Sequence, residues 1–267
     1  MSRDGPTPAG RGSTATIRVL EADPELGYRV PPARVSEARA QLVAPVRHLT
    51  RGVWEVPDDA TEPGHLGFLI LEGRIARDLV LTGTVCTELL GEGDVLQPAI
   101  AERDDGLVHC HVLWHALEPV RMADLDRHFA HALTAYPQVI ATLLERAIRR
   151  SVRMAVHMAL LSLSPVETRL LVLFWHLAER WGKVTHEGVV LSPGLTHQLL
   201  GQLVGCRRAS VTTALKELCD SGRAVRREDG GWLLTGKPPD ELSQLTWHRG
   251  DPQTARRPAR PLAQARR

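Results

Sequence analysis

The sequence of 267 residues predicts an α+β protein, and three observations lead to this fold class. Short apolar runs separated by turn residues fill residues 43–116, as is typical of a β-sandwich or jelly roll. A long helical pattern with an apolar stripe follows Pro137. Two short helices joined by a glycine, and then a hairpin signal, occupy residues 195–235.

Composition and charge narrow the class of protein. An apolar fraction of 43% allows proper cores, and the length favours about two domains. The net charge is only +2, so any affinity for nucleic acid must come from a local basic surface. The sequence shows neither a signal peptide nor an apolar run long enough to span a bilayer, so we expect a soluble, cytoplasmic protein without membrane contact.

The four cysteines point to the same compartment. They are widely spaced and form no CxxC pair, which favours a reduced protein with buried thiols over a disulfide framework. They are Cys86, Cys110, Cys206 and Cys219.

The N-terminal half is predicted to consist of a disordered segment followed by the β-sandwich. Residues 1–16 are rich in glycine, proline, serine and threonine and are predicted to be disordered. Residues 17–123 form the sandwich, in which residues 17–28 add a short strand or lie on the surface and residues 35–42 form a helix. Strands are expected at the apolar runs of residues 66–71, 75–81, 85–90 and 107–117.

Residues 124–163 are predicted to form two helices, the first over residues 124–135. The second begins at Pro137, since proline suits the first helical position, and is roughly 40 Å long at 1.5 Å per residue. Its apolar stripe is wider than one face of a sandwich would cover, so we expect the same helix of a second copy to cover it. Packing within one chain is the alternative. The stripe comprises Ile140, Leu144, Ala147 or Ile148, Ser151, Met154 or Ala155, Met158 and Leu161.

The C-terminal domain is expected over residues 164–236. Ser164 and Glu167 flank Pro165 and Val166 in the pattern of a capping box, which predicts a helix continuing to Trp181. Residues 183–191 then read as a small hairpin.

The helix pair that follows has the features of a helix-turn-helix. Thr196 is a candidate N-cap, Gly201 lets another helix cross closely, and Gly205 suits a left-handed turn. The second helix begins near Arg207 or Arg208 and buries Val211, Ala214, Leu215 and Leu218. Its other face exposes Arg207, Arg208, Ser210, Thr212, Thr213 and Lys216.

A second hairpin follows this helix pair. Residues 224–227 and 232–235 read as two strands around an Asp-Gly turn. A helix-turn-helix followed by such a hairpin is a winged helix, which binds the DNA major groove. A purely structural helix pair is the alternative.

These residues resemble a known family. LTHQLLGQLVGCRRASVTTALKEL followed by GRAVRREDGGWLL is similar to the C-terminal domain of the cyclic-AMP receptor protein and fumarate–nitrate regulator family. The resemblance extends more weakly over residues 43–236, where LLGEGDVL resembles the glycine turn of the family's effector-binding β-roll.

The resemblance implies a transcriptional regulator rather than an enzyme. It implies a homodimer on a double-stranded DNA operator, with a degenerate cyclic-nucleotide-type sensor and no cofactor. RNA polymerase and an unidentified small-molecule effector are left open as further partners. The sequence contains no nucleophile elbow, Walker loop or GxGxxG. A ligand-binding or protein-interaction module without DNA-regulatory activity is the rival class.

The family resemblance also implies roles for the exposed residues. The start of the second helix meets base edges, so Arg208 is expected to contact guanine O6 and N7, and Thr213 occupies a second base-reading position. Phosphate contacts are expected from Arg207, Ser210, Thr212, Thr196, Gln198, Arg226 and Arg227. The family's best-known pattern has glutamate and arginine where this chain has Ala209 and Thr213, so the operator should differ.

Other chemistry finds little support in the sequence. His109, Cys110, His111 and His115 resemble a metal cluster, but alternation along a strand separates them and favours ordinary strand residues. Iron–sulfur sensors of the family need a group of cysteines near the N-terminus, but no cysteine precedes Cys86 in this chain. Nothing specific supports haem binding at His48 or His65.

The stretch that matches the family's cyclic-AMP cassette departs from it. Arg103 lies among Glu102, Asp104 and Asp105, and this acidic run should repel a phosphodiester. We therefore expect no cyclic-AMP binding there. Residues 237–267 are predicted to form a disordered basic tail that adds solubility or non-specific DNA affinity.

Overall fold

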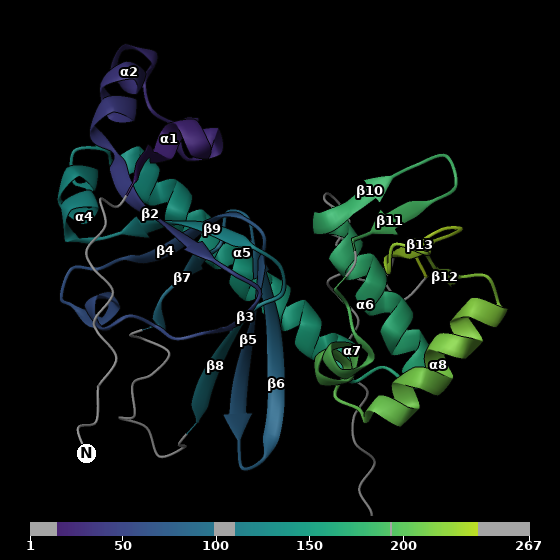
Figure 1. Ribbon diagram of the computed structural model, residues 1–267. Coiled ribbons are helices and arrows are strands. Elements are labelled where there is room, and N and C mark those ends of the chain that lie inside the picture. The colour runs from purple at the N-terminus through teal and green to yellow at the C-terminus, as the bar shows by residue number, and fades with distance from the viewer. Residues whose placement is uncertain (1–14, 99–109, 193, 240–267) are drawn as a thin grey trace, which may run out of the picture.

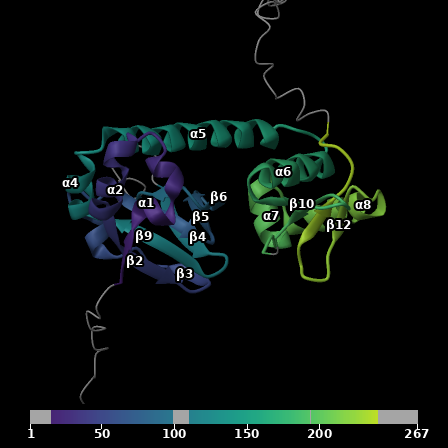
Figure 2. The same ribbon diagram turned by 90° about the horizontal axis from the view of Figure 1, so that it is seen from above.

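The computed structural model describes residues 15–98, 110–192 and 194–239. Two sheets form its N-terminal part and a smaller, helix-rich part follows, while the 25-residue helix α5 (Pro137–Leu161) runs from one part to the other (Figures 1 and 2). Most of the predicted disordered start and basic tail, and the whole run around Arg103, lie outside the described residues. Thr16, assigned to the disordered start, instead belongs to a strand.

The two N-terminal sheets are antiparallel and face each other. The first has the order β1 (Thr16–Arg18), β2 (Val43–Leu49), β9 (Val120–Leu125), β4 (Gly67–Glu72) and β7 (Val95–Leu96). The second has the order β3 (Gly52–Trp54), β8 (His111–Ala116), β5 (Arg74–Leu81) and β6 (Thr84–Gly91). A buried layer that includes Trp54, Phe68, Ile70, Trp114 and Met122 fills the space between them.

The strand predictions agree with these bounds to within a residue, with one exception. Of the predicted strand at residues 107–117, β8 includes His111–Ala116 but not Cys110 or Leu117, and residues 107–109 lie outside the described residues. The sequence did not delimit β2 or β9, whose apolar runs are interrupted by charged residues and, in β2, a proline, nor the three-residue β3.

A second core lies on the other face of the five-stranded sheet. It is covered by four short helical segments: α1 (Val19–Ala22), η1 (Pro24–Gly27), α2 (Pro32–Gln41) and α4 (Arg127–Leu133). Of the two alternatives for residues 17–28, the short strand is present as β1, which ends at Arg18. Val19, Leu20 and Leu26 are buried in this second core instead of lying on the surface. A further 3-10 turn, η2 (Asp58–Thr61), follows β3.

The helix predicted from Asp124 begins three residues later. Asp124 is the next-to-last residue of strand β9, and its carboxylate accepts hydrogen bonds from Arg47 Nε at 2.7 Å and from His65 Nε2 at 2.7 Å. Asp126 is the true N-cap of α4, because its side chain accepts from His128 N and Phe129 N. Two aspartates fit a cap equally well in the sequence, and only the long-range partners of Asp124 distinguish them.

The C-terminal part combines three helices with a four-stranded sheet. The helices are α6 (Val166–Trp181), α7 (His197–Val204) and α8 (Arg208–Asp220). The sheet has the order β10 (Gly182–Val184), β11 (Val189–Leu191), β13 (Trp232–Leu234) and β12 (Ala224–Arg226). The core of this part also includes Ala76 of β5 and Leu160 of α5, with Leu89 and Leu117 packed against it.

The predicted capping box at Ser164 is wrong. Pro165 is itself the N-cap residue of α6, and no side chain caps the helix. Because Pro165 has extended dihedral angles, Ser164 lies one residue too far from the first turn to cap it. The start of α6 is held instead by Arg169, which donates to Leu163 O at 2.8 Å and to Val204 O at 2.7 Å.

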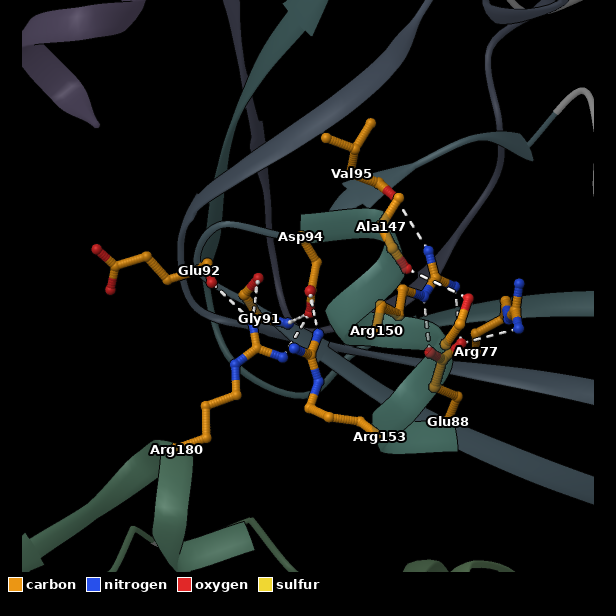
Figure 3. Close-up of polar contacts among 11 residues, drawn as sticks. Arg77, Glu88, Gly91, Glu92, Asp94, Val95, Ala147, Arg150, Arg153 and Arg180 are labelled. Carbon is orange, nitrogen blue, oxygen red and sulfur yellow. Dashed lines mark hydrogen bonds and ion pairs between the residues drawn. The ribbon is translucent and has the colours of Figure 1, made fainter. Parts of the chain in front are cut away.

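One carboxylate joins the two parts of the chain. Asp94, in the turn between β6 and β7, is only 4% exposed and accepts from Gly91 N at 3.0 Å. It also pairs with Arg153 of α5 at 2.7 Å and with Arg180 of α6 at 2.6 Å (Figure 3). Arg180 donates in addition to the carbonyl oxygen of Glu92 at 2.7 Å. The turn, α5 and α6 therefore meet at a single buried charge.

We predict that Asp94→Ala lowers the free energy of unfolding by about 3 kcal/mol, because it leaves two partly buried guanidinium groups without their anion. Urea unfolding followed by circular dichroism measures the change. Glu92→Ala is the matched control, since Glu92 is exposed in the same turn. Equal stabilities for the two variants would contradict the role assigned to Asp94.

Candidate nucleic-acid interface

The turn between α7 and α8 requires glycine at two positions. Gly205 has φ 63°, in the left-handed region. A Cβ atom on Gly201 would lie 2.8 Å from the carbonyl oxygen of Cys206, so the two segments approach too closely for any side chain. Thr196 caps α7 as predicted, because its hydroxyl oxygen accepts from Leu199 N at 3.1 Å.

Helix α8 has one buried and one exposed face, as the sequence predicts. Val211, Ala214, Leu215 and Leu218 are all buried in the core. In Figure 1, α8 lies at the outer edge of the C-terminal part. The nine predicted contact residues are all exposed: Thr196, Gln198, Arg207, Arg208, Ser210, Thr212, Thr213, Lys216 and Arg226.

Two of the predicted hydroxyl groups already have partners within the protein. Thr212 Oγ1 donates to Arg208 O at 3.1 Å and lies 3.1 Å from His197 Nδ1. Thr213 Oγ1 donates to Ala209 O at 3.4 Å. The two bonds to carbonyl oxygens join each threonine to the residue four positions earlier in α8, an arrangement common for threonine within a helix.

The two arginines of the hairpin β12–β13, Arg226 and Arg227, have different partners. The guanidinium group of Arg226 lies 4.9 Å from the centre of the Trp232 ring, and its side chain is exposed. Arg227 pairs with Asp229 at 3.3 Å. The hydrogen bond from Gly231 N, and then Arg227, hold the pKa of Asp229 below its usual value, so this carboxylate stays ionised. Arg227 is therefore less available to an outside phosphate than Arg226.

The sequence interpretation missed two residues of this surface. His197 follows the Thr196 cap directly and contacts Thr212, which connects the starts of the two helices. Arg223 is exposed between α8 and β12, and its Nε lies 3.3 Å from Ser221 Oγ. The signals that could have identified them are the neighbouring cap residue Thr196 for His197 and the neighbouring turn residue Gly222 for Arg223.

The surface is locally basic although the chain is nearly neutral. Residues 196–227 contain six arginines and lysines against two acidic residues, Glu217 and Asp220, whereas the whole chain has a net charge of +2. This is the local concentration of positive charge that a near-neutral protein needs to bind a polyanion.

Two of the histidines considered for metal or haem, His65 and His115, have protein partners. His65 Nδ1 accepts from Gly67 N at 3.0 Å, so the proton lies on Nε2 and is donated to Asp124. His115 Nε2 lies 3.5 Å from Asp78. Over the ranges that the structure describes, no group of three His, Cys, Asp or Glu side chains could hold a metal ion. His109 lies outside those ranges.

The cysteine prediction needs correction. All four thiols are free, as expected, but Cys86 is exposed and the other three are only partly buried. Cys86 lies near the hairpin end of the edge strand β6, so a wide spacing of cysteines gave no information about burial.

Similarity to known proteins is visible in structure and not in sequence. Neither a family model nor a curated protein sequence matches the chain significantly. A cyclic nucleotide-binding domain containing protein from Listeria monocytogenes EGD-e superposes with a TM-score of 0.58 at 16% identity, over 79% of this chain and 96% of that one. The c-di-GMP responsive global regulator CLP of Xanthomonas campestris gives 0.55 at 16% identity, over 78% and 100%.

A CRP-family transcriptional regulator from Thermus thermophilus gives a TM-score of 0.53 at 15% identity, over 71% of this chain and 92% of that one. The chain has the fold of CRP/FNR regulators. In the described part of the chain, no helix combines the length and apolar character needed to cross a membrane.

We predict that Gly201→Ala lowers the free energy of unfolding by about 2 kcal/mol, because the added methyl group must displace the backbone at Cys206. Thermal unfolding measures the loss. Gln202→Ala, one residue further along α7 and only half-buried, should change stability by less than about 0.5 kcal/mol. A Gly201→Ala protein as stable as wild type would show that the close approach is not needed.

Proposed function

We propose that this protein is a sequence-specific DNA-binding transcriptional regulator that acts as a homodimer. In this proposal α7 and α8 form the helix-turn-helix and β12–β13 the wing, which together span residues 164–236 with α6. The two sheets form a jelly-roll β-roll, a degenerate cyclic-nucleotide-type sensor domain. The observation that supports DNA binding most strongly is the exposed basic face of α8, whose opposite face is fully buried.

The proposed contacts to bases come from the start of α8. Arg208 is the first residue of the helix, with an exposed guanidinium group that suits a bidentate bond to guanine O6 and N7. Thr213 lies on the same exposed face as a second candidate base contact.

The remaining proposed contacts are to phosphates. Arg207, Ser210 and Lys216 are exposed on and just before α8. A phosphate bond from Thr212 requires its hydroxyl to turn away from Arg208 O. Contacts that flank the recognition helix are assigned to Thr196, Gln198 and Arg226. Since the Thr196 oxygen accepts within the cap, its O–H proton is available to a phosphate oxygen.

The homodimer proposal depends on the outer face of α5. Its inner face turns arginines toward the sheets, where Arg150 pairs with Glu88 at 2.7 Å. Its outer face exposes large apolar side chains, and Leu144 is 60% and Met158 69% exposed. The other exposed members are Ile140, Ile148, Val152 and Met154. A two-fold partner helix would cover this stripe and place two reading heads roughly 34 Å apart.

A mobility-shift assay with the DNA upstream of the protein's own gene separates this proposal from its rival. A specific shift supports a regulator. For such a regulator we propose a cytoplasmic location and RNA polymerase as a further partner. Failure to retard any genomic DNA would favour a ligand-binding or protein-interaction module.

We predict that Leu144→Asp converts a dimer into a monomer at micromolar concentration, because a charge within the stripe opposes its burial. Light scattering coupled to size exclusion measures the mass. Val184→Asp is the control, since Val184 is 86% exposed in the hairpin β10–β11 and away from α5. A wild-type protein that is already monomeric would refute the dimer and leave DNA binding to be tested separately.

A second prediction separates two adjacent arginines. Arg208→Ala should cost roughly 1–3 kcal/mol on the cognate site and relax the preference at one base pair. Arg207→Ala should weaken binding to all sequences alike and flatten the salt dependence. Fluorescence anisotropy with cognate and random duplexes at several salt concentrations measures both effects. Equal losses on both duplexes for both variants would show that Arg208 does not read a base.

A further inference from the structure

A pocket of about 110 Å³ lies where four elements from both parts of the chain meet. Strand β6 and helices α5, α6 and α7 all contribute to its wall. Apolar side chains form most of the lining: Leu89, Met154, Met158, Leu161, Leu177, Trp181 and Leu203. Its polar residues include Glu88, Arg153, His157, His176 and Arg180. The pocket therefore combines a large apolar surface with a few polar groups, as small-molecule sites do.

The size of the pocket limits what it can hold. An apolar cavity of roughly 150 Å³ accommodates benzene in another protein. A pocket of 110 Å³ with an open mouth therefore suits an apolar body about the size of one ring.

The charges beside the pocket are unequal. Arg77 and Arg150 share Glu88, at 2.8 Å and 2.7 Å. Arg153 and Arg180 share Asp94 (Figure 3). Four guanidinium groups thus face two carboxylates, which leaves two positive charges in excess next to an apolar wall. Such an excess favours an anionic ligand.

Two histidines in the wall are neutral hydrogen-bonding groups. His157 Nε2 donates to Leu203 O at 2.8 Å, and burial lowers its pKa. Burial first, and then the nearby His157 and Arg153, lower the pKa of His176 to about 4. The acidic neighbour of His176 is the exposed Glu179, 3.8 Å away on the same helix. Burial contributes most to this shift, and the charge of Arg153, which would also attract an anion, adds to it.

We infer that this pocket binds a small organic carboxylate with an apolar body about the size of one ring. The body contacts Met154, Leu177 and Trp181, and the carboxylate accepts hydrogen bonds from Arg153 and from the N–H of neutral His176, since the N–H of His157 is already donated to Leu203 O. The site adjoins the interior of the β-roll, because Glu88 of its wall accepts from Arg150, which also donates to Val95 O.

Occupancy of the pocket would join the two parts of the chain. Leu89 belongs to β6, whereas Leu177 and Leu203 belong to α6 and α7 of the C-terminal part. A ligand in contact with all three stabilises one placement of α7 and α8 against the sheets. A regulatory effect of the ligand on DNA binding rests on the proposed function; the binding itself does not.

The test uses the full-length protein without DNA and two fluorinated probes. Fluorine NMR should show saturable binding of 4-fluorobenzoate and at least tenfold weaker binding of the neutral 4-fluorobenzyl alcohol. Arg153→Met should weaken the carboxylate at least tenfold and leave the alcohol unchanged. No saturable binding of either probe at millimolar concentration would overturn the site, and equal affinities would overturn its preference for anions.

Two further measurements locate the bound probe. Met154→Trp adds bulk at the pocket wall and should weaken the carboxylate at least tenfold, whereas Val184→Trp, 86% exposed in the hairpin β10–β11 and outside both the lining and the α5 stripe, should not. In the wild-type protein, saturation with 4-fluorobenzoate should raise the pKa of His176, measured from its ring resonances, because a nearby anion stabilises the imidazolium form. Binding that leaves the His176 pKa unchanged would overturn the assignment to this pocket, even if Met154→Trp fails to fold.

Discussion

The ionised carboxylate of Asp94 determines how the two parts of this chain meet. A buried anion is costly unless cations and hydrogen-bond donors surround it, and here they come from its own turn, from α5 and from α6. Because the three groups must converge on two oxygen atoms, the orientation of α6 relative to the sheets is restricted. The helix pair α7–α8 packs on α6 in the same core, so the exposed basic surface inherits this orientation.

Helix α5 separates two kinds of interaction on opposite faces. Arginines on the inner face pair with carboxylates of the N-terminal part, including Arg146 with Asp23 at 2.9 Å. The outer face holds the apolar side chains assigned to a second copy. One helix can thus connect the N-terminal sheets, the proposed dimer axis and the C-terminal part. These roles share no side chains except Met154 and Met158, which also line the pocket.

Local sequence patterns predicted the elements better than their partners. The 3.6-residue period predicted α5 and both faces of α8, and the glycines predicted the turn at Gly205, because periodicity and backbone freedom are local properties. The start of α4 and the cap of α6 were wrong, since the competing bonds of Asp124 and Arg169 connect residues distant in the sequence. In the candidate site, exposure was predicted for all nine residues, but the pairing of Arg227 with Asp229 and of Thr212 with His197 was not. Asp94 and Arg180 are 86 positions apart, and no pattern in the sequence associates them.

The core of the C-terminal part extends beyond that part. Ala76 and Leu160 are buried within it, and Leu89 and Leu117 pack against it, although all four precede the helix-rich segment. A fragment that begins at Ser164 would lose these four neighbours and expose the apolar side chains that they cover. Such a fragment should self-associate or precipitate, so the segment proposed to read DNA is not a freely transferable module and its solubility depends on the sheets.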